Sequence, residues 1–137
     1  MALPSISDPP DYRALATLRE GLHELERFTE RVSREHGCTG SMFELLLAVK
    51  TARRGRGLDI GMIATSLRMR HPSAAEMVRK ADTRGLLTLA PDPDDGRRVL
   101  VGLSDIGEKI VEAIADDQSA EVRRLRAGFV SALNALG

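Results

Sequence analysis

Two groups of polar side chains in the middle of the chain have the types and spacing that suit hydrogen bonding to nucleic acid. Arg70, His71, Ser73 and Glu76 stand at the start of a predicted helix. An arginine can bind a guanine through two hydrogen bonds, and a glutamate can accept one from the amino group of a cytosine. The first turns of such a helix are the part that enters a DNA groove, so these four residues are predicted base contacts.

The next turn of the same helix offers an alternative for Glu76. Arg79 and Lys80 lie three and four residues further on, where either can pair with the glutamate along the helix surface. The residue types and spacing fit the base contact and the intrahelical ion pair equally well. Arg79 and Lys80 themselves belong to the exposed face and are included among the predicted DNA contacts, and His71 is alternatively a turn residue without a partner.

A second group, Asp95, Arg97 and Arg98, follows the turn-forming stretch PDPDDG. Arg97 is predicted to reach into a narrow minor groove, whose negative potential attracts a guanidinium. Asp95 is expected to orient Arg97 through a charge-assisted hydrogen bond. Arg98 is expected on the other face of the strand, because successive side chains alternate. The alternative is a charged turn that is merely solvated, since Asp92 and Asp94 make it less basic.

The elements that position these residues run from Asp59 to Ser104. Asp59 is a predicted N-cap, and Pro72 and Gly85 mark the beginning and end of a second helix. Apolar residues recur at helical spacing in the first helix, at positions 60, 63, 64 and 67, and in the second, at 74, 77, 78 and 81. Two β-rich runs, LLTLA and RRVLVGL, then flank the turn. The pattern predicts a helix-turn-helix followed by a hairpin, which is a winged helix.

Within this stretch, Asp95-Gly96-Arg97, a short apolar strand and then Leu103-Ser104-x-x-Gly107 resemble the wing signature of the MarR family. The resemblance covers nearly the whole chain. It implies a wing arginine, here Arg97, in the minor groove, and N- and C-terminal helices that interlock two subunits across a two-fold axis.

The fold class is therefore predicted to be mostly α, with a small β component. A single domain is expected over 1–137, with dimerisation helices at 10–36 and 104–137 and the winged-helix DNA reader at 37–103. The helix over 12–32 is expected to begin after Pro9 and Pro10. Thr39 and Ser41 compete as N-cap of the core helix, Ser41 as part of a capping box with Glu44. Ser104 caps the last helix, with Gly128 or the Gln118-Ser119 step as a candidate break.

Charge and composition narrow the function classes. The formal net charge is zero, but residues 37–103 carry 11 basic and 7 acidic side chains, while each flank is acidic. Arg53, Arg54 and Arg56 form a basic loop that is either a solvated connection or a phosphate contact. No phosphate loop, activated nucleophile or metal-ligand spacing points to an enzyme, a metal or a cofactor. The single cysteine, Cys38, is expected to be an inert apolar residue. Without a signal peptide or membrane span, a cytoplasmic location is expected.

These features predict a homodimeric, sequence-specific regulator of transcription, expected to be a repressor, that binds a palindromic site in double-stranded DNA. The resemblance also implies a small lipophilic or phenolic effector. Tyr12, His23 and His36 are candidate effector-binding residues, each with ordinary surface or core as the alternative. The other hypothesis is a winged-helix protein-interaction module without specific DNA binding, which the zero net charge and acidic wing favour.

Overall fold

The computed structural model describes residues 10–52 and 57–137. In these residues the chain forms five helices and one two-stranded antiparallel sheet, in the order α1 (Tyr12–Glu35), α2 (Gly40–Lys50), α3 (Ile60–Leu67), α4 (His71–Thr83), β1 (Leu87–Pro91), β2 (Val99–Leu103) and α5 (Asp105–Leu136). The predicted mostly helical winged-helix fold is confirmed. The arginines at 53, 54 and 56 and the proline at 9 lie outside the described residues.

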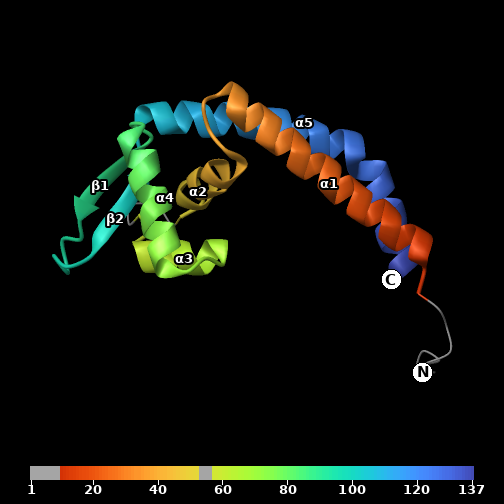
Figure 1. Cartoon of the computed structure of the whole chain (residues 1–137), viewed down its shortest axis with the longest axis horizontal. Coiled ribbons are helices and arrows are strands. Elements are labelled where there is room, and N and C mark those ends of the chain that lie inside the picture. Colours follow the sequence, from red (N-terminus) through yellow and green to blue (C-terminus); the bar gives the residue numbers. More distant parts are fainter. Residues whose placement is uncertain (1–9, 53–56) are drawn as a thin grey trace.

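The long helices α1 and α5 lie side by side and form an arm that projects from the rest of the molecule (Figure 1). Asp11 caps α1 by accepting a hydrogen bond from the amide of Ala14 at 2.9 Å. The predicted breaks in α5 are wrong, because the helix continues through both places for 32 residues. The Gln118 side chain faces α1, where it donates a hydrogen bond to the Thr29 hydroxyl at 2.9 Å.

The remaining elements form the winged-helix body, with α2 as its central helix. Five of the eleven residues of α2 are buried, namely Met42, Phe43, Leu45, Leu46 and Val49. The choice of N-cap is resolved in favour of Thr39, whose hydroxyl accepts a hydrogen bond from the amide of Met42. Ser41 lies inside the helix, so the predicted capping box with Glu44 does not form.

The helix-turn-helix consists of α3 and α4, joined by three residues. Asp59 caps α3 as predicted, because its carboxylate accepts a hydrogen bond from the amide of Met62 at 2.7 Å. The turn is made by Arg68, whose left-handed backbone (φ 55°) ends α3. Pro72 lies in the first turn of α4, and Gly85 follows the end of α4 with a φ of +73°. The first turn of α4 tolerates proline because its amides have no partner within the helix.

The wing is the hairpin of β1 and β2, with Leu87 opposite Leu103 and Pro91 opposite Val99. Leu58 pairs with Val101 on the other side of β2, which fastens the hairpin to the segment before α3. Val101 is fully buried. The hairpin therefore rests on the core by its base while its turn extends outward.

Ser104 and Gly107 join the wing to α5. The Ser104 hydroxyl accepts a hydrogen bond from the Gly107 amide at 3.0 Å, as expected for the cap of this helix. A side chain at residue 107 would place its Cβ 2.1 Å from the carbonyl oxygen of Leu86. This close approach explains why the segment requires glycine three residues after the cap.

Candidate nucleic-acid interface

The start of α4 presents polar side chains to solvent. Arg70 is the residue before the helix, and its side chain makes no capping hydrogen bond. Arg70, His71, Ser73 and Glu76 are all exposed, as the sequence predicted. Since no side chain caps this helix, its first amide groups are available to an anion such as a phosphate, which the helix dipole also favours.

The opposite face of α4 attaches the helix to the core. Ala74 and Ala81 are fully buried and Val78 is 3% exposed, while Met77 packs against the same cluster. The predicted division into an apolar face and a polar face is confirmed. The small alanines let α4 lie close to α2 and α3, so the position of its polar face is fixed by core packing.

Glu76 and Arg79 form an ion pair along the surface of α4. The Arg79 guanidinium donates two hydrogen bonds to the Glu76 carboxylate, at 2.5 and 3.0 Å. The hydrogen bond from Arg79 lowers the pKa of Glu76, because it stabilises the charged form of the carboxylate. The intrahelical alternative for Glu76 is therefore the arrangement present in the structure, and a base contact by Glu76 stays a prediction.

The wing turn exposes Arg97 almost completely. Its side chain is 96% exposed, and its Nε lies 3.7 Å from Oδ1 of Asp95. This distance is too long for a hydrogen bond. The expected side-chain hydrogen bond is therefore absent, and Asp95 instead accepts one from the backbone amide of Arg97 at 3.1 Å. Asp95 thus shapes the backbone of the turn and lies within ion-pair distance of the Arg97 guanidinium, which is otherwise surrounded by solvent.

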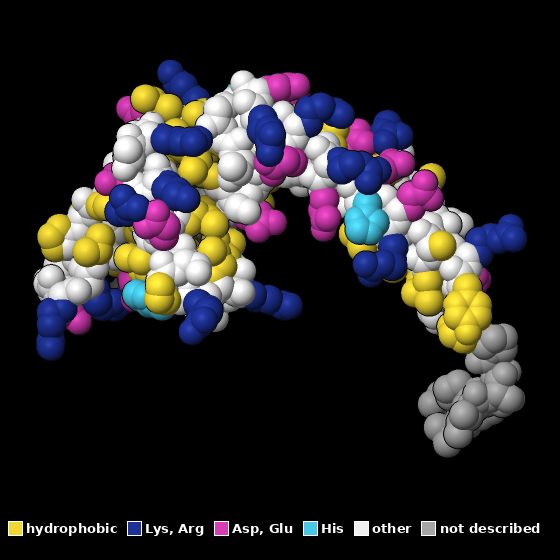
Figure 2. Space-filling view, in the orientation of Figure 1, with side chains coloured by type: hydrophobic (Ala, Val, Ile, Leu, Met, Phe, Trp, Pro, Cys, Tyr) yellow, Lys and Arg dark blue, Asp and Glu magenta, His cyan; other side chains and the backbone are white. Residues whose placement is uncertain are grey.

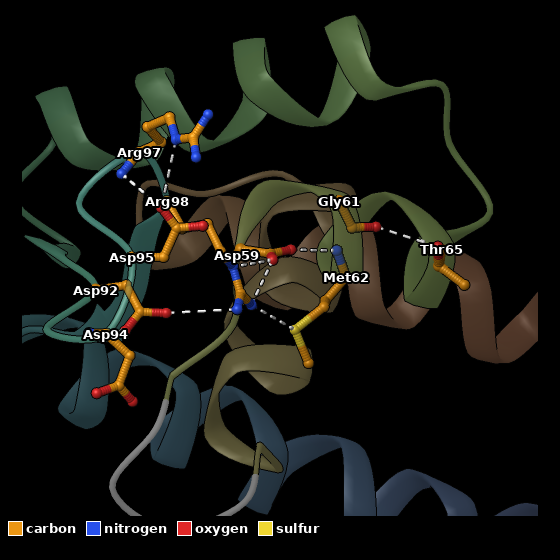
Figure 3. Close-up of polar contacts among 9 residues, drawn as sticks. All are labelled: Asp59, Gly61, Met62, Thr65, Asp92, Asp94, Asp95, Arg97 and Arg98. Atoms are coloured by element: carbon orange, nitrogen blue, oxygen red, sulfur yellow. Dashed lines mark hydrogen bonds and ion pairs between the residues drawn. The ribbon is translucent and has the colours of Figure 1, made fainter.

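Arg98 points away from Arg97 and back toward α3 (Figure 3). Its guanidinium donates hydrogen bonds of 2.6 and 3.0 Å to one carboxylate oxygen of Asp59 and lies 3.4 Å from the carboxylate of Asp92. The amide of Met62 and the Arg98 guanidinium both lower the pKa of Asp59. DNA contact by Arg98 stays a prediction, but its guanidinium is already engaged by two carboxylates of its own chain.

Basic side chains follow the free edge of the winged-helix body from the wing turn toward α3 (Figure 2). Sequence reasoning missed Arg68, an exposed cation in the turn before α4, although its proximity to Arg70 and His71 was a usable signal. It also missed the second role of Asp59 as a partner of Arg98. Arg84 has a different task, because its guanidinium donates a hydrogen bond to the carbonyl oxygen of Gly37.

The three candidate effector residues do not come together. Tyr12 is 70% exposed at the start of α1, His23 lies 4.0 Å from Glu26 in the middle of that helix, and His36 follows its end. A separate groove of about 470 Å³ lies between α1, α2 and α5. Its lining includes Leu22, Leu25, Phe43, Leu47, Glu26, Glu30, Glu44 and Gln118.

Cys38, the apolar character of the helices and the placement of metal-ligating side chains bear on the remaining predictions. Cys38 is 3% exposed, and burial raises the pKa of its thiol, so the reactive thiolate is disfavoured. None of the helices in residues 10–52 and 57–137 has the length and apolar character needed to cross a membrane. Within the same ranges, no group of three or more histidine, cysteine or acidic side chains is arranged to hold a metal ion.

Comparison with curated protein sequences gives relatives described as HTH-type transcriptional regulators. No family model matches the chain. Two HTH-type transcriptional regulators, from Mycobacterium bovis and Mycobacterium tuberculosis, are each 34% identical to it over 68 residues. The matches cover 50% of this chain and 48% of each relative, so the chain spans about half the length of the curated relatives it matches.

Solved structures match more of the chain at lower identity. The MepR–DNA complex of S. aureus superimposes with a TM-score of 0.71 and 23% identity, covering 85% of this chain and 82% of MepR. AbsC, a MarR family transcriptional regulator from Streptomyces coelicolor, gives a TM-score of 0.71 with 18% identity, covering 91% of this chain and 82% of AbsC. The predicted resemblance is confirmed in its architecture: the chain has the winged helix-turn-helix fold of the MarR family transcription regulators.

Proposed function

We propose that this protein is a DNA-binding transcriptional regulator of the MarR type. The observation that carries the proposal is the pair of exposed elements on one body: the uncapped start of α4 with Arg70, His71 and Ser73, and the wing turn with Arg97. In this account α4 enters the major groove and Arg97 enters the adjacent minor groove. Arg79 and Lys80, further along α4, face the phosphates.

The arm supports a homodimer. Large apolar side chains are exposed along α1 and α5, namely Tyr12, Leu15, Leu22, Val122, Val130, Leu133 and Leu136. Surfaces with many exposed apolar residues commonly mark protein interfaces, and a two-fold arrangement lets one surface cover its own copy. We therefore assign α1 and α5 to dimerisation. Two α4 helices about 34 Å apart would then read the half-sites of a palindrome.

Repression and its release are the further parts of this proposal. A repressor of this kind would block transcription by occupying its site, and an effector would act by favouring a different spacing of the two readers. We place the effector in the groove between α1, α2 and α5, because it contacts both the arm and the body. Leu25 and Phe43 suit a lipophilic ligand. Glu30 is already paired with Arg34, so the carboxylates of Glu26 and Glu44 are the ones that favour a cation over a phenolate.

Hydroxyl-radical footprinting, combined with measurement of the mass of the complex, tests the regulator directly. The expected result is two chains on one duplex and two protected half-sites about one helical turn apart, each with minor-groove protection beside it. A single chain per duplex, or protection without a two-fold pattern, would contradict the dimeric reader. If no duplex is protected, the protein-interaction module becomes the better hypothesis.

The effector has its own test. Thermal unfolding is measured with a lipophilic aromatic quaternary ammonium dye and with a phenolate of similar size. The dye is expected to raise the unfolding temperature, because it binds the folded groove. Glu44→Gln, which removes one lining carboxylate, is expected to reduce that rise. Stabilisation by the phenolate alone would contradict the assignment of a cationic ligand.

A further inference from the structure

Arg98 is placed to hold the wing against the helix-turn-helix. It follows Arg97 directly, yet the two side chains leave the turn in different directions (Figure 3). The Arg97 side chain is 96% exposed, whereas that of Arg98 is 44% exposed and lies among Asp59, Asp92 and Met62. Because the two residues are neighbours, fixing the Arg98 guanidinium restricts the directions that Arg97 can take.

Asp59, the partner of Arg98 on the winged-helix body, is held in place by a second hydrogen bond. One oxygen of the Asp59 carboxylate accepts the capping hydrogen bond from Met62 at 2.7 Å, and the other accepts both hydrogen bonds from Arg98. The Asp59 side chain is only 23% exposed. One carboxylate therefore joins the start of α3 to the wing, and α3 is packed against α4, which carries the predicted base contacts.

Asp92, the partner of Arg98 in the wing, also forms hydrogen bonds within the wing turn. One oxygen of Asp92 accepts a hydrogen bond from the amide of Asp94 at 2.9 Å, while the other lies 3.4 Å from the Arg98 guanidinium. The backbone amide of Asp92 donates to the carbonyl of Arg98 at 2.9 Å. The Asp92 side chain is only 12% exposed, whereas that of Arg98 remains 44% exposed.

We propose that Arg98 is a positioning residue. Its contacts with Asp59 and Asp92, here called the latch, hold the wing against the start of α3 and so set the direction of Arg97 relative to α4. The proposal rests on the proposed function for its effect on DNA. It is an alternative to the prediction that Arg98 contacts DNA itself. A planar guanidinium with two carboxylates on it is well suited to fix geometry, whereas lysine provides only a point charge.

Asp92→Asn and its control Asp94→Asn separate the latch from a DNA contact. Both changes remove one negative charge from the wing, but of these two carboxylates only that of Asp92 forms an ion pair with Arg98 in the described part of the chain. Asparagine at 92 keeps an oxygen for the Asp94 amide. If Arg98 contacted phosphate, both variants would bind DNA at least as tightly as the wild type. The latch predicts that Asp92→Asn weakens binding about five-fold or more relative to Asp94→Asn.

Arg98→Lys provides a second comparison, because it retains the charge and loses the planar fork. The latch predicts loss of the preference for A·T over G·C pairs where the wing meets the minor groove, while preference within the major-groove half-site is retained. A variant that was only destabilised would lose affinity for all duplexes equally. Equal affinities of Asp92→Asn and Asp94→Asn, with the A·T preference retained in Arg98→Lys, would overturn the latch.

Hydrogen exchange of the free protein tests the latch without DNA. Amides of residues 94–98 are expected to exchange faster in Asp92→Asn than in the wild type, with no change in Asp94→Asn. Unchanged exchange in Asp92→Asn would overturn the latch, whatever the result with DNA. If the wild type binds no duplex but exchange responds as expected, the proposed function fails and the latch stands.

Discussion

The hydroxyl of Ser104 donates a hydrogen bond of 2.6 Å to the carbonyl oxygen of Gly85. The same hydroxyl accepts a hydrogen bond from the amide of Gly107, and the Ser104 amide donates to the carbonyl of Leu86. One residue therefore joins the end of α4 to the start of α5. The start of α5 is thus tied to the end of α4, the helix that carries the predicted base contacts.

Ser104→Ala is expected to lower the free energy of unfolding by about 1–2 kcal/mol, because it removes the cap of α5 and a donor to Gly85. Urea unfolding followed by circular dichroism measures the change. Ser119→Ala, at an exposed position of the same helix, is the control and should lie close to the wild type. Equal stability of the two variants would contradict the role given to Ser104.

Gly107→Ala and Gly128→Ala are expected to change stability in opposite directions. A Cβ at 107 would meet the carbonyl oxygen of Leu86 at 2.1 Å, so the backbone must shift, at a cost of about 1–3 kcal/mol. A Cβ at 128 has no atom within 4 Å in the described chain, so alanine there should stabilise α5 by roughly 0.5–1 kcal/mol. Thermal unfolding of both variants checks the signs. Stabilisation by Gly107→Ala would contradict the close packing of the wing base on α5.

Local sequence signals predicted most of the fold. Asp59 as N-cap, Pro72 in a first turn and Gly85 after a helix end are residue types whose backbone preferences act within a few positions. Two predictions based on residue type alone were wrong, because packing and neighbouring residues decide these positions. Serine is a common N-cap residue, but Ser41 does not cap α2, because the helix begins earlier and Thr39 is its N-cap. Glycine often interrupts helices, yet α5 continues through Gly128, and the helix as a whole packs against α1.

The candidate site was less predictable, since its contacts join distant parts of the chain. Arg98 and Asp59 are 39 residues apart, so no spacing rule pairs them. The Glu76–Arg79 pair was foreseeable because three residues bring side chains together on a helix, but the sequence could not choose between that pair and a base. The groove between α1, α2 and α5 is formed by packing and has no motif.

Glu76→Gln is expected to tighten binding to every duplex and to leave sequence preference unchanged. The substitution removes a negative charge from the face of α4 and releases the Arg79 guanidinium toward the phosphates. Kd values are compared for the preferred duplex and for single base-pair variants of it. Loss of preference at one base pair would instead assign Glu76 to base recognition.

Stability should fall at acid pH partly through Glu30. Hydrogen bonds from Arg34 and from the Gly40 amide, at 3.0 and 2.7 Å, lower the pKa of this carboxyl group in the folded protein. Its contribution is therefore present above the unfolded pKa of about 4.3 and is lost as pH falls through the lower folded value. Between about pH 5 and 3, Glu30→Gln should lose less stability than the wild type. Parallel pH profiles of the two proteins would contradict this linkage.

The most direct measurement is the affinity of the protein for the intergenic DNA upstream of its own coding sequence, compared with a shuffled duplex over a salt series. A sequence-specific regulator is expected to prefer its own upstream DNA by about 10³-fold or more and to lose affinity steeply as the salt concentration rises. Arg97→Ala should weaken binding to both duplexes and reduce the salt slope, whereas Arg70→Ala should reduce the preference itself. Equal affinity of the wild type for the two duplexes at every salt concentration would contradict the assignment as a sequence-specific regulator.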